Sequence, residues 1–263
     1  MRMRQFRTQP WKPPMPLTFP RIAYEALEVC NGVTMAAIEA AAARTGLAEG
    51  AEALDIGAGN AAVAIRLAGV FGLAVTAIEM DPGMADLARS RIAGAGAGDR
   101  VALVVAASAE VLARTPPVDL ITALGTTNVT GEGRPTPEAS FVALRQSLRP
   151  GGWLLWGDLV WLSEPPGPLR QLVEATNLYA DHSGWQAAAR AAGLKVVLAE
   201  VSPQAVFDDY AHALADAARR WLEANPAAPE AGAVGIDADR VRAMLDYGRG
   251  YIGFGLYLLR NPG

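Results

Sequence analysis

The chain has 263 residues, which suits one large domain or two small ones. Hydrophobic residues make up 51% of it and charged residues 19%, a composition that excludes a wholly disordered protein. The formal net charge of −4 provides no global basic field for nucleic acid or anionic lipid, so we expect neither as a partner.

Two further features bear on where the protein works. The longest runs without a charged residue, 67–78 and 120–131, are twelve residues each, whereas a membrane span needs ~20 apolar residues. The single cysteine, Cys30, excludes an internal disulfide framework and a thiolate metal cage. We therefore expect a cytoplasmic protein with no membrane partner.

The first 21 residues differ in composition from the rest. They carry basic residues without an acid and are interrupted by five prolines, which disfavour a helix and prevent the apolar stretch of a signal peptide. We expect residues 1–21 to form a flexible arm. The alternative is a strap over the active site, packed through Phe6, Trp11 and Phe19.

Residues 22–263 are expected to form a single domain. A helical pattern over 22–44 comes first, and short apolar runs then alternate with helical or turn-rich segments. The predicted strands are 53–56, 74–78, 101–105, 119–124 and 153–156, and the predicted helices are 61–68, 82–93, 109–114 and 138–148. This alternation is typical of a parallel sheet with helices on both faces.

Two more β-rich runs, 194–201 and 251–259, follow in the last third of the chain. Between them lies a helical insert, about 203–249, with helices expected over 208–223 and 237–249. The apolar face of its first helix suits either packing against the core or covering a pocket as a lid.

A glycine loop carries the first chemical signal. Asp55-x-Gly57-x-Gly59 joins a strand to a helix, where glycines permit a tight turn and let the backbone approach a ligand. Glu79 ends the next strand, where its carboxylate can accept hydrogen bonds from both hydroxyls of a ribose. Met80 then offers an apolar surface for an adenine ring. The combination predicts a nucleoside site.

The position of Asp55 distinguishes between two nucleoside cofactors. A carboxylate two residues before Gly57 repels the pyrophosphate of a nicotinamide cofactor but suits a ligand with an ammonium and a sulfonium group. S-adenosyl-L-methionine is such a ligand. A nicotinamide-dependent oxidoreductase remains the rival enzyme, and a non-catalytic nucleoside-binding module is the rival without chemistry.

Three motifs resemble those of class I S-adenosylmethionine-dependent methyltransferases. They are the glycine loop, Glu79-Met80-Asp81-Pro82 and Leu148-Arg149-Pro150-Gly151-Gly152-Trp153. The second half of the chain resembles a poorly characterised bacterial branch that acts on small molecules. This resemblance implies a Rossmann-like α/β fold with a seven-stranded, mostly parallel sheet, helices on both faces and an antiparallel last strand.

The resemblance also assigns cofactor-binding residues. It implies that Asp55 senses the cationic methionine end, that Gly57 and Gly59 line it, and that Glu79 and Met80 hold ribose and adenine. Ser108-Ala109 stands where the family commonly has an acidic residue against the adenine amine, so that contact is weaker here. Leu124-Gly125 is expected to border the transferable methyl.

The sequence gives weaker signals for the residues that bind or activate the acceptor. His182, before a helix start, and Asp158, expected to end the fifth strand, are the candidates for catalysis, whereas His212 reads as a solvated helix residue. The loop after Leu124 lacks the carboxylates of a metal-dependent enzyme, so no metal is expected. Six aromatic residues suit either the core or an acceptor pocket (Trp161, Tyr179, Trp185, Phe207, Tyr210 and Trp221).

These observations predict methyl transfer to O, N or C of a small-molecule acceptor, without a metal. The identity of the acceptor does not follow from the sequence. We expect a monomer or a homodimer, and the sequence does not distinguish between them.

Overall fold

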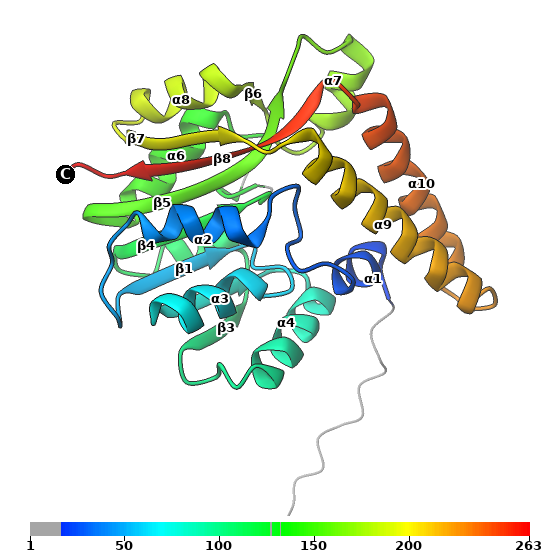
Figure 1. The fold of residues 1–263 in the computed structure, drawn as a ribbon, viewed down its shortest axis with the longest axis horizontal. Coiled ribbons are helices and arrows are strands. Elements are labelled where there is room, and N and C mark those ends of the chain that lie inside the picture. Colours follow the sequence, from blue (N-terminus) through cyan, green and yellow to red (C-terminus); the bar gives the residue numbers. More distant parts are fainter. Residues whose placement is uncertain (1–16, 127, 132) are drawn as a thin grey trace, which may run out of the picture.

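The computed structural model describes residues 17–126, 128–131 and 133–263. Within these ranges helices and strands alternate along much of the chain (Figure 1). The helices are α1 (Phe19–Glu25), α2 (Met35–Ala43), α3 (Ala62–Phe71), α4 (Pro82–Gly94), α5 (Ser108–Leu112), α6 (Pro137–Gln146), α7 (Gly167–Val173), α8 (His182–Ala191), α9 (Gln204–Ala224) and α10 (Ala231–Gly248). The strands are β1 (Glu52–Ile56), β2 (Ala74–Glu79), β3 (Val101–Val105), β4 (Val118–Leu124), β5 (Leu148–Trp161), β6 (Ala180–Asp181), β7 (Lys195–Val201) and β8 (Ile252–Arg260).

The strands form one mixed sheet in the order β3-β2-β1-β4-β5-β8-β7. Neighbours from β3 to β5 are parallel, and β8 lies antiparallel between β5 and β7. This arrangement confirms the expected fold class. The structure adds β6, a two-residue strand that pairs with the end of β5 and that the sequence does not predict.

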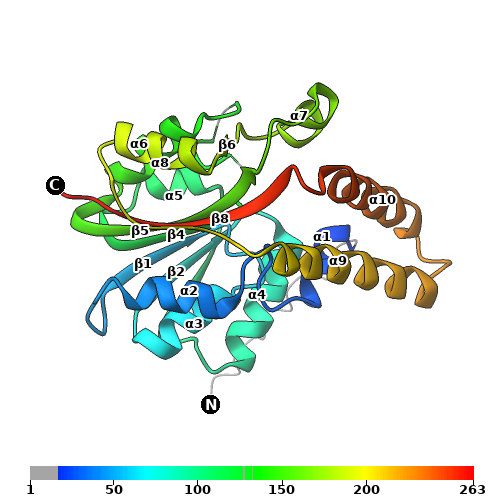
Figure 2. The same ribbon diagram turned by 45° about the horizontal axis from the view of Figure 1, so that its top comes forward.

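Helices cover both faces of the sheet (Figure 2). Helices α2, α3 and α4 pack on one face, where Ala53 and Ala77 leave room for them. Helices α6 and α8 pack on the other face, over Leu54 and Ile56. Because both faces are covered, the central strands are apolar on both sides, as is usual for parallel sheets.

The predicted helix over 22–44 is two helices in the structure. Helix α1 begins at Phe19, inside the expected arm, and α2 begins at Met35, where the hydroxyl of Thr34 accepts a hydrogen bond from the Ala37 amide. The helical spacing of apolar residues continues across the segment between the two helices, so the sequence does not reveal the break. In that segment Gly32 packs on Phe207, and a Cβ at Gly32 would lie 2.5 Å from the Phe207 ring. The rest of the expected arm, with Phe6 and Trp11, lies outside the described residues.

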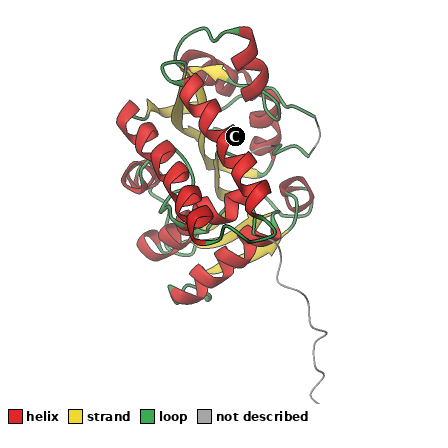
Figure 3. Cartoon of the chain, turned by 90° about the vertical axis from the view of Figure 1, so that its right-hand side faces the viewer, coloured by secondary structure: helices red, strands yellow, loops and turns green. Residues whose placement is uncertain are grey.

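The helical insert forms an antiparallel pair beyond the carboxyl ends of the parallel strands (Figures 1 and 3). Leu214 and Ala218 of α9 pack against Phe19 and Ala23 of α1, so the apolar face of α9 is a packing face. Helix α10 begins at Ala231, six residues earlier than predicted, because the glycines at its start do not interrupt it. None of the described helices has the length and apolar character needed to cross a membrane.

Candidate functional site

A cleft of about 360 Å³ opens at the carboxyl ends of β1, β2 and β4. One wall comes from α1 and the loop that follows it, which together we call the roof segment (residues 19–34). The lining residues are Pro20, Tyr24, Cys30, Asn31, Gly57, Gly59, Ile78, Glu79, Met80, Asp81, Met84, Ala106, Ala107, Ser108, Leu124, Gly125, Thr126, Asn128 and Gly131. This edge of an open α/β sheet is where ligands bind in such folds.

The glycine loop forms the floor of the cleft. Gly57 and Gly59 both have positive φ, 66° and 55°, which a side chain disfavours. A Cβ on Gly57 would also lie 2.6 Å from the Thr126 hydroxyl. The loop therefore presents bare backbone to the cleft, as the sequence predicts. Ala61, in place of a third glycine, adopts φ 61° at the start of α3.

Glu79 and Met80 line the cleft beside this loop. The Glu79 carboxylate accepts hydrogen bonds from the amides of Gly59 and Asp81, each at 2.8 Å. Burial is the main cause that raises the pKa of Glu79. Each carboxylate oxygen keeps a lone pair that a ligand hydroxyl can use. Met80 is 67% exposed, so an apolar surface stands open at the same end of the cleft.

Asp55 does not line the cleft, contrary to our expectation. Its side chain is 3% exposed and accepts a hydrogen bond from the Thr122 hydroxyl at 2.5 Å. Successive strand residues point to opposite faces, and Asp55 shares the α3 face with Ala53. Burial raises its pKa to about 6. Asp55 therefore lies beneath the glycine loop and is not part of the cleft wall.

The remaining predicted cofactor residues divide in a similar way. Ser108 lines the cleft, but its hydroxyl donates to the Val129 carbonyl at 3.3 Å. Leu124 and Gly125 line it where β4 ends, whereas Ala109 does not. Seven of the nine predicted positions thus meet in one cleft (Gly57, Gly59, Glu79, Met80, Ser108, Leu124 and Gly125).

Neither candidate for catalysis reaches the cleft. His182 begins α8, where its ring stacks on Tyr257 and its Nδ1 lies 3.2 Å from the Tyr257 hydroxyl. Asp158 lies inside β5 and not at its end, because β5 continues to Trp161 in pairing with β8. A direct role for either residue has no support from this geometry.

Asp158 is nevertheless unusual. It is 3% exposed, Oδ1 accepts from the Leu159 amide at 2.8 Å, and Oδ2 meets no partner in the described part of the chain. Burial raises the pKa of Asp158 to about 8. The residue is therefore protonated at neutral pH, which lowers the cost of burying it.

Sequence reasoning raised a strap over the active site within residues 1–21, but it named none of the roof residues that line the cleft as site residues. Tyr24, Cys30 and Asn31 come to the cleft from the roof segment, and the Asn31 side-chain amide donates to the Leu124 carbonyl at 2.9 Å. Burial raises the pKa of Cys30 to about 11, so the thiol stays protonated. Only the adjacency of the segment to the glycine loop in the sequence could have hinted at this, since it carries no motif.

The six aromatic residues do not form an acceptor pocket at the cleft. Trp161, Trp185 and Phe207 are at most 6% exposed and belong to the core, where Trp185 packs against Phe141 and Trp156. His212 is exposed on α9, as expected. Across residues 17–263, less positions 127 and 132, no group of three or more His, Cys, Asp or Glu residues is placed to hold a metal ion.

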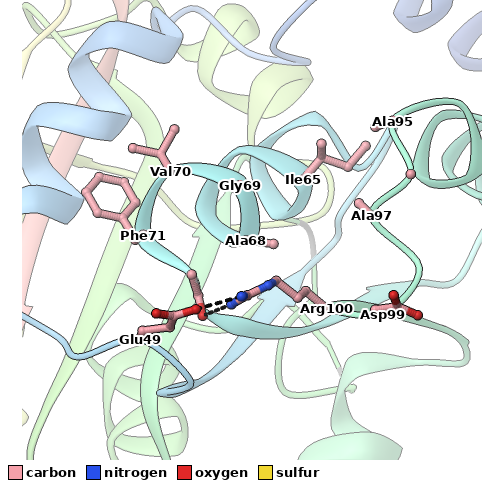
Figure 4. A pocket seen from close by; sticks show the side chains of 12 residues that line it. Glu49, Ile65, Ala68, Gly69, Val70, Phe71, Ala95, Ala97, Asp99 and Arg100 are labelled. Atoms are coloured by element: carbon pink, nitrogen blue, oxygen red, sulfur yellow. Dashed lines mark hydrogen bonds and ion pairs between the residues drawn. The ribbon is translucent and has the colours of Figure 1, made fainter.

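A larger hollow of about 530 Å³ lies between the ends of α3 and α4 (Figure 4). It is at the other end of the strands, and no predicted site residue lines it. Its guanidinium group, Arg100, is already held by Glu49 at 2.6 Å and by the Gly72 carbonyl at 2.8 Å. This hollow therefore offers less chemistry than the cleft.

Gly125 provides a direct test of the cleft wall. A Cβ at this position would lie 2.0 Å from Asn31 Oδ1, and φ is 63°. We expect Gly125→Ala to lower the free energy of unfolding by about 2–4 kcal/mol, from strain and from the lost Asn31 contact. Urea unfolding measures this. Gly46→Ala is the matched control, because φ there is 62° and nothing lies within 4 Å. Equal losses in the two variants would contradict the packing of Asn31.

Comparison with known proteins gives three findings. Residues 53–152 match a family described as methyltransferase domain. The chain is 28% identical over 214 residues to the uncharacterised Escherichia coli protein YjhP, covering 80% of this chain and 84% of YjhP. The crystal structure of YjhP superposes with a TM-score of 0.75 at 24% identity, covering 92% of this chain and 98% of that one.

Two further solved structures are similar across nearly the whole chain. One is a SAM-dependent methyltransferase from Geobacter sulfurreducens in complex with S-adenosyl-L-homocysteine, with TM-score 0.78, 26% identity and coverage of 92% and 96%. The other, from Thiobacillus denitrificans with the same ligand, has TM-score 0.76, 24% identity and coverage of 91% and 96%. The second likeness concerns the fold alone.

Proposed function

We propose that the chain is an S-adenosylmethionine-dependent methyltransferase, because residues 53–152 match a methyltransferase domain and a similar solved structure is a SAM-dependent methyltransferase. S-adenosyl-L-methionine binds in the cleft at the ends of β1, β2 and β4, and its methyl group passes to O, N or C of a small-molecule acceptor. The observation that carries this proposal is that Glu79 and the bare backbone of Gly57 and Gly59 line the same cleft. The Geobacter sulfurreducens relative was crystallised with S-adenosyl-L-homocysteine.

The residues of the cleft fit this ligand in four places. The Gly57–Gly59 backbone approaches the methionine end, where no side chain stands in the way. Both oxygens of Glu79 keep lone pairs for the two ribose hydroxyls. Met80 provides the exposed apolar surface against which adenine lies. Leu124 and Gly125 then border the methyl-bearing end.

The chemistry asks little of the protein beyond placement. The cofactor supplies a methyl group already activated on a sulfonium, so the protein's task is to hold the acceptor in line and exclude water. The roof segment contributes both to holding the acceptor and to excluding water. The Tyr24 side chain lines the cleft and packs against the same apolar cluster as Tyr210 of α9.

The acceptor side is polar and uncharged among the described residues. Asn31, Thr126 and Asn128 line it, and the lining carboxyl groups, Glu79 and Asp81, belong to the nucleoside end. We therefore propose transfer without a metal and without a protein carboxylate as base, to an acceptor whose nucleophilic atom already carries a free lone pair at neutral pH.

Calorimetric titration tests this proposal. We expect S-adenosylhomocysteine to bind with a dissociation constant in the micromolar range, about −8 kcal/mol, and the reduced nicotinamide cofactor not to bind. Candidate acceptors are then screened for the mass gain of one methyl group. Saturation by the nicotinamide cofactor without binding of S-adenosylhomocysteine would establish the oxidoreductase instead. Binding without turnover of any acceptor would favour the non-catalytic module.

A further inference from the structure

Asn60 joins the glycine loop to the roof segment. It follows Gly59 directly, is 2% exposed and belongs to the loop that forms the cleft floor. Its side-chain NH₂ group lies within hydrogen-bonding distance of three carbonyl oxygens, those of Tyr24 (3.2 Å), Leu27 (3.0 Å) and Glu28 (3.4 Å). Its Oδ1 accepts from the Ala62 amide at 3.0 Å, which fixes the side chain to the start of α3.

The carbonyls that Asn60 contacts lie where α1 ends. The last carbonyls of a helix have no partner within it and need donors from elsewhere. Arg91 of α4 supplies further donors: its guanidinium group donates to the Glu25 carbonyl at 2.8 Å and to the Leu27 carbonyl at 3.2 Å. The end of α1 is thus held by the glycine loop and by α4.

The roof segment in turn places groups at the acceptor side. Cys30 lies close enough to the loop that a Cβ on Gly59 would be 3.2 Å from its sulfur. Asn31 reaches the end of β4 through its bond to the Leu124 carbonyl. Helix α1 also packs against α9 and α10 of the insert. One short segment therefore touches the floor of the cleft, its acceptor side and the insert.

We propose that Asn60 is a positioning residue that couples binding at the glycine loop to the order of the roof segment. The inference rests on the proposed function, in which the cofactor binds against Gly59. Gly59 is also held by Glu79, so any ligand that fixes Gly59 fixes the backbone that carries Asn60. Coupling of this kind is reciprocal: an ordered roof segment also favours cofactor binding.

The side chain at this position needs a particular chemistry. It must donate to several carbonyls and accept from the Ala62 amide while it stays neutral, because it is buried. Aspartate has the same shape and keeps the acceptor, but it offers the three carbonyls a negative oxygen in place of a donor. Asn60→Asp is therefore the sharpest variant.

Amide hydrogen exchange over residues 24–34, with and without S-adenosylhomocysteine, tests the coupling. In the unaltered protein we expect the ligand to slow exchange in this segment by about tenfold or more, equivalent to about one hydrogen bond. In Asn60→Asp we expect that protection to fall to about twofold or less at saturating ligand. A residue that only supported the fold would leave the ligand-induced protection of this segment in place.

Asn261→Asp is the matched control. Asn261 is also buried and donates to two backbone carbonyls, those of Leu148 and Arg149, while its Oδ1 accepts from Arg145. It lies where β5 begins, at the other end of the sheet. We expect this variant to keep the full ligand-induced protection of residues 24–34.

Arg91→Met is the second variant, in case Asn60→Asp does not fold. Arg91 is only half-buried, and its removal frees the same end of α1, so we expect the same loss of protection. Unchanged protection in a folded Asn60→Asp, or in Arg91→Met where the first variant does not fold, would overturn the coupling. So would ligand binding to the unaltered protein without protection of this segment. Failure of S-adenosylhomocysteine to bind the unaltered protein would overturn the proposed function itself.

Discussion

Replacing Glu79 by glutamine is expected to weaken S-adenosylhomocysteine binding about 30- to 1000-fold, because one hydrogen bond to a charged acceptor is lost and the other is made to a neutral oxygen. The carboxylate also holds the amides of Gly59 and Asp81 at 2.8 Å each. Glutamine has one acceptor oxygen and an NH₂ group, so at least one of these amides faces a donor. The variant therefore damages the ribose site and the shape of the glycine loop together.

The affinity for S-adenosylhomocysteine is expected to depend on pH in a defined direction. Burial raises the pKa of Glu79, and hydrogen bonding from ribose hydroxyls favours the ionised carboxylate. We therefore expect the affinity of the unaltered protein to fall as the pH is lowered through this raised pKa. Glu79→Gln cannot titrate and should lose this part of the pH dependence. Calorimetry at several pH values measures both effects.

Two control variants separate the site from the rest of the molecule. Glu200→Gln removes an exposed carboxylate from β7, and His182→Ala removes the ring that stacks on Tyr257. Neither residue lines the cleft, and both variants should keep the affinity of the unaltered protein. Unchanged affinity in a folded Glu79→Gln would mean that ribose is held elsewhere.

The floor of the cleft could be predicted because it depends on local sequence. A parallel sheet brings the ends of successive strands to one edge, so the glycine loop and Glu79 had to meet there. The orientation of the Asp55 side chain could also have been predicted, because the alternation of side chains along β1 puts it with Ala53 on the face covered by α3. The expectation that Asp55 senses the methionine end, partly through water, followed the motif and did not take this alternation into account.

The roof and the acceptor side could not be predicted in the same way. Asn31 reaches Leu124 across 93 positions of sequence, and Asn60 reaches Leu27 across 33. These contacts depend on a break between α1 and α2 that the helical periodicity conceals. Asp158 was placed at a strand end because β5 was predicted too short. Its actual length follows from pairing with β8, about a hundred residues later in the chain.

Replacing Asp158 by asparagine is expected to leave the stability nearly unchanged below about pH 4 and to make the protein increasingly more stable than the unaltered one as the pH rises to about 8. Burial raises the pKa of this carboxyl to about 8 in the folded protein, against about 3.9 in an unfolded chain. Folding therefore takes up a proton between these two values. The contribution of Asp158 to the free energy of unfolding is therefore highest below the lower pKa and declines as the pH rises towards 8.

The size of this decline follows from the linkage between proton binding and folding. Each pH unit between the two pKa values costs about 1.4 kcal/mol, so the interval from pH 5 to pH 8 costs about 4 kcal/mol or somewhat less. Asparagine keeps the acceptor for the Leu159 amide and has no proton to take up. Urea unfolding at pH 5, 6.5 and 8 should show a gain for the variant that grows with pH.

Asp181→Asn is the control of opposite sign. Asp181 caps α8, and hydrogen bonds from Gly184 and Ser183 lower its pKa, so its contribution is lost only as the pH falls. That variant should leave the slope between pH 5 and pH 8 unchanged. A slope in Asp158→Asn equal to that of the unaltered protein would show that Asp158 is ionised in the fold.

The same variant decides whether Asp158 takes part in the reaction. Because its side chain lies on the α6 and α8 side of the sheet and does not line the cleft, Asp158→Asn should bind S-adenosylhomocysteine as the unaltered protein does. Turnover should also persist once an acceptor is known. Loss of turnover with affinity retained would return Asp158 to the acceptor side, which it could reach through the small hollow that it lines together with Thr126. The buried carboxyl group would then lower the stability of the protein but be required for the reaction. Such opposition between stability and activity is known from active sites.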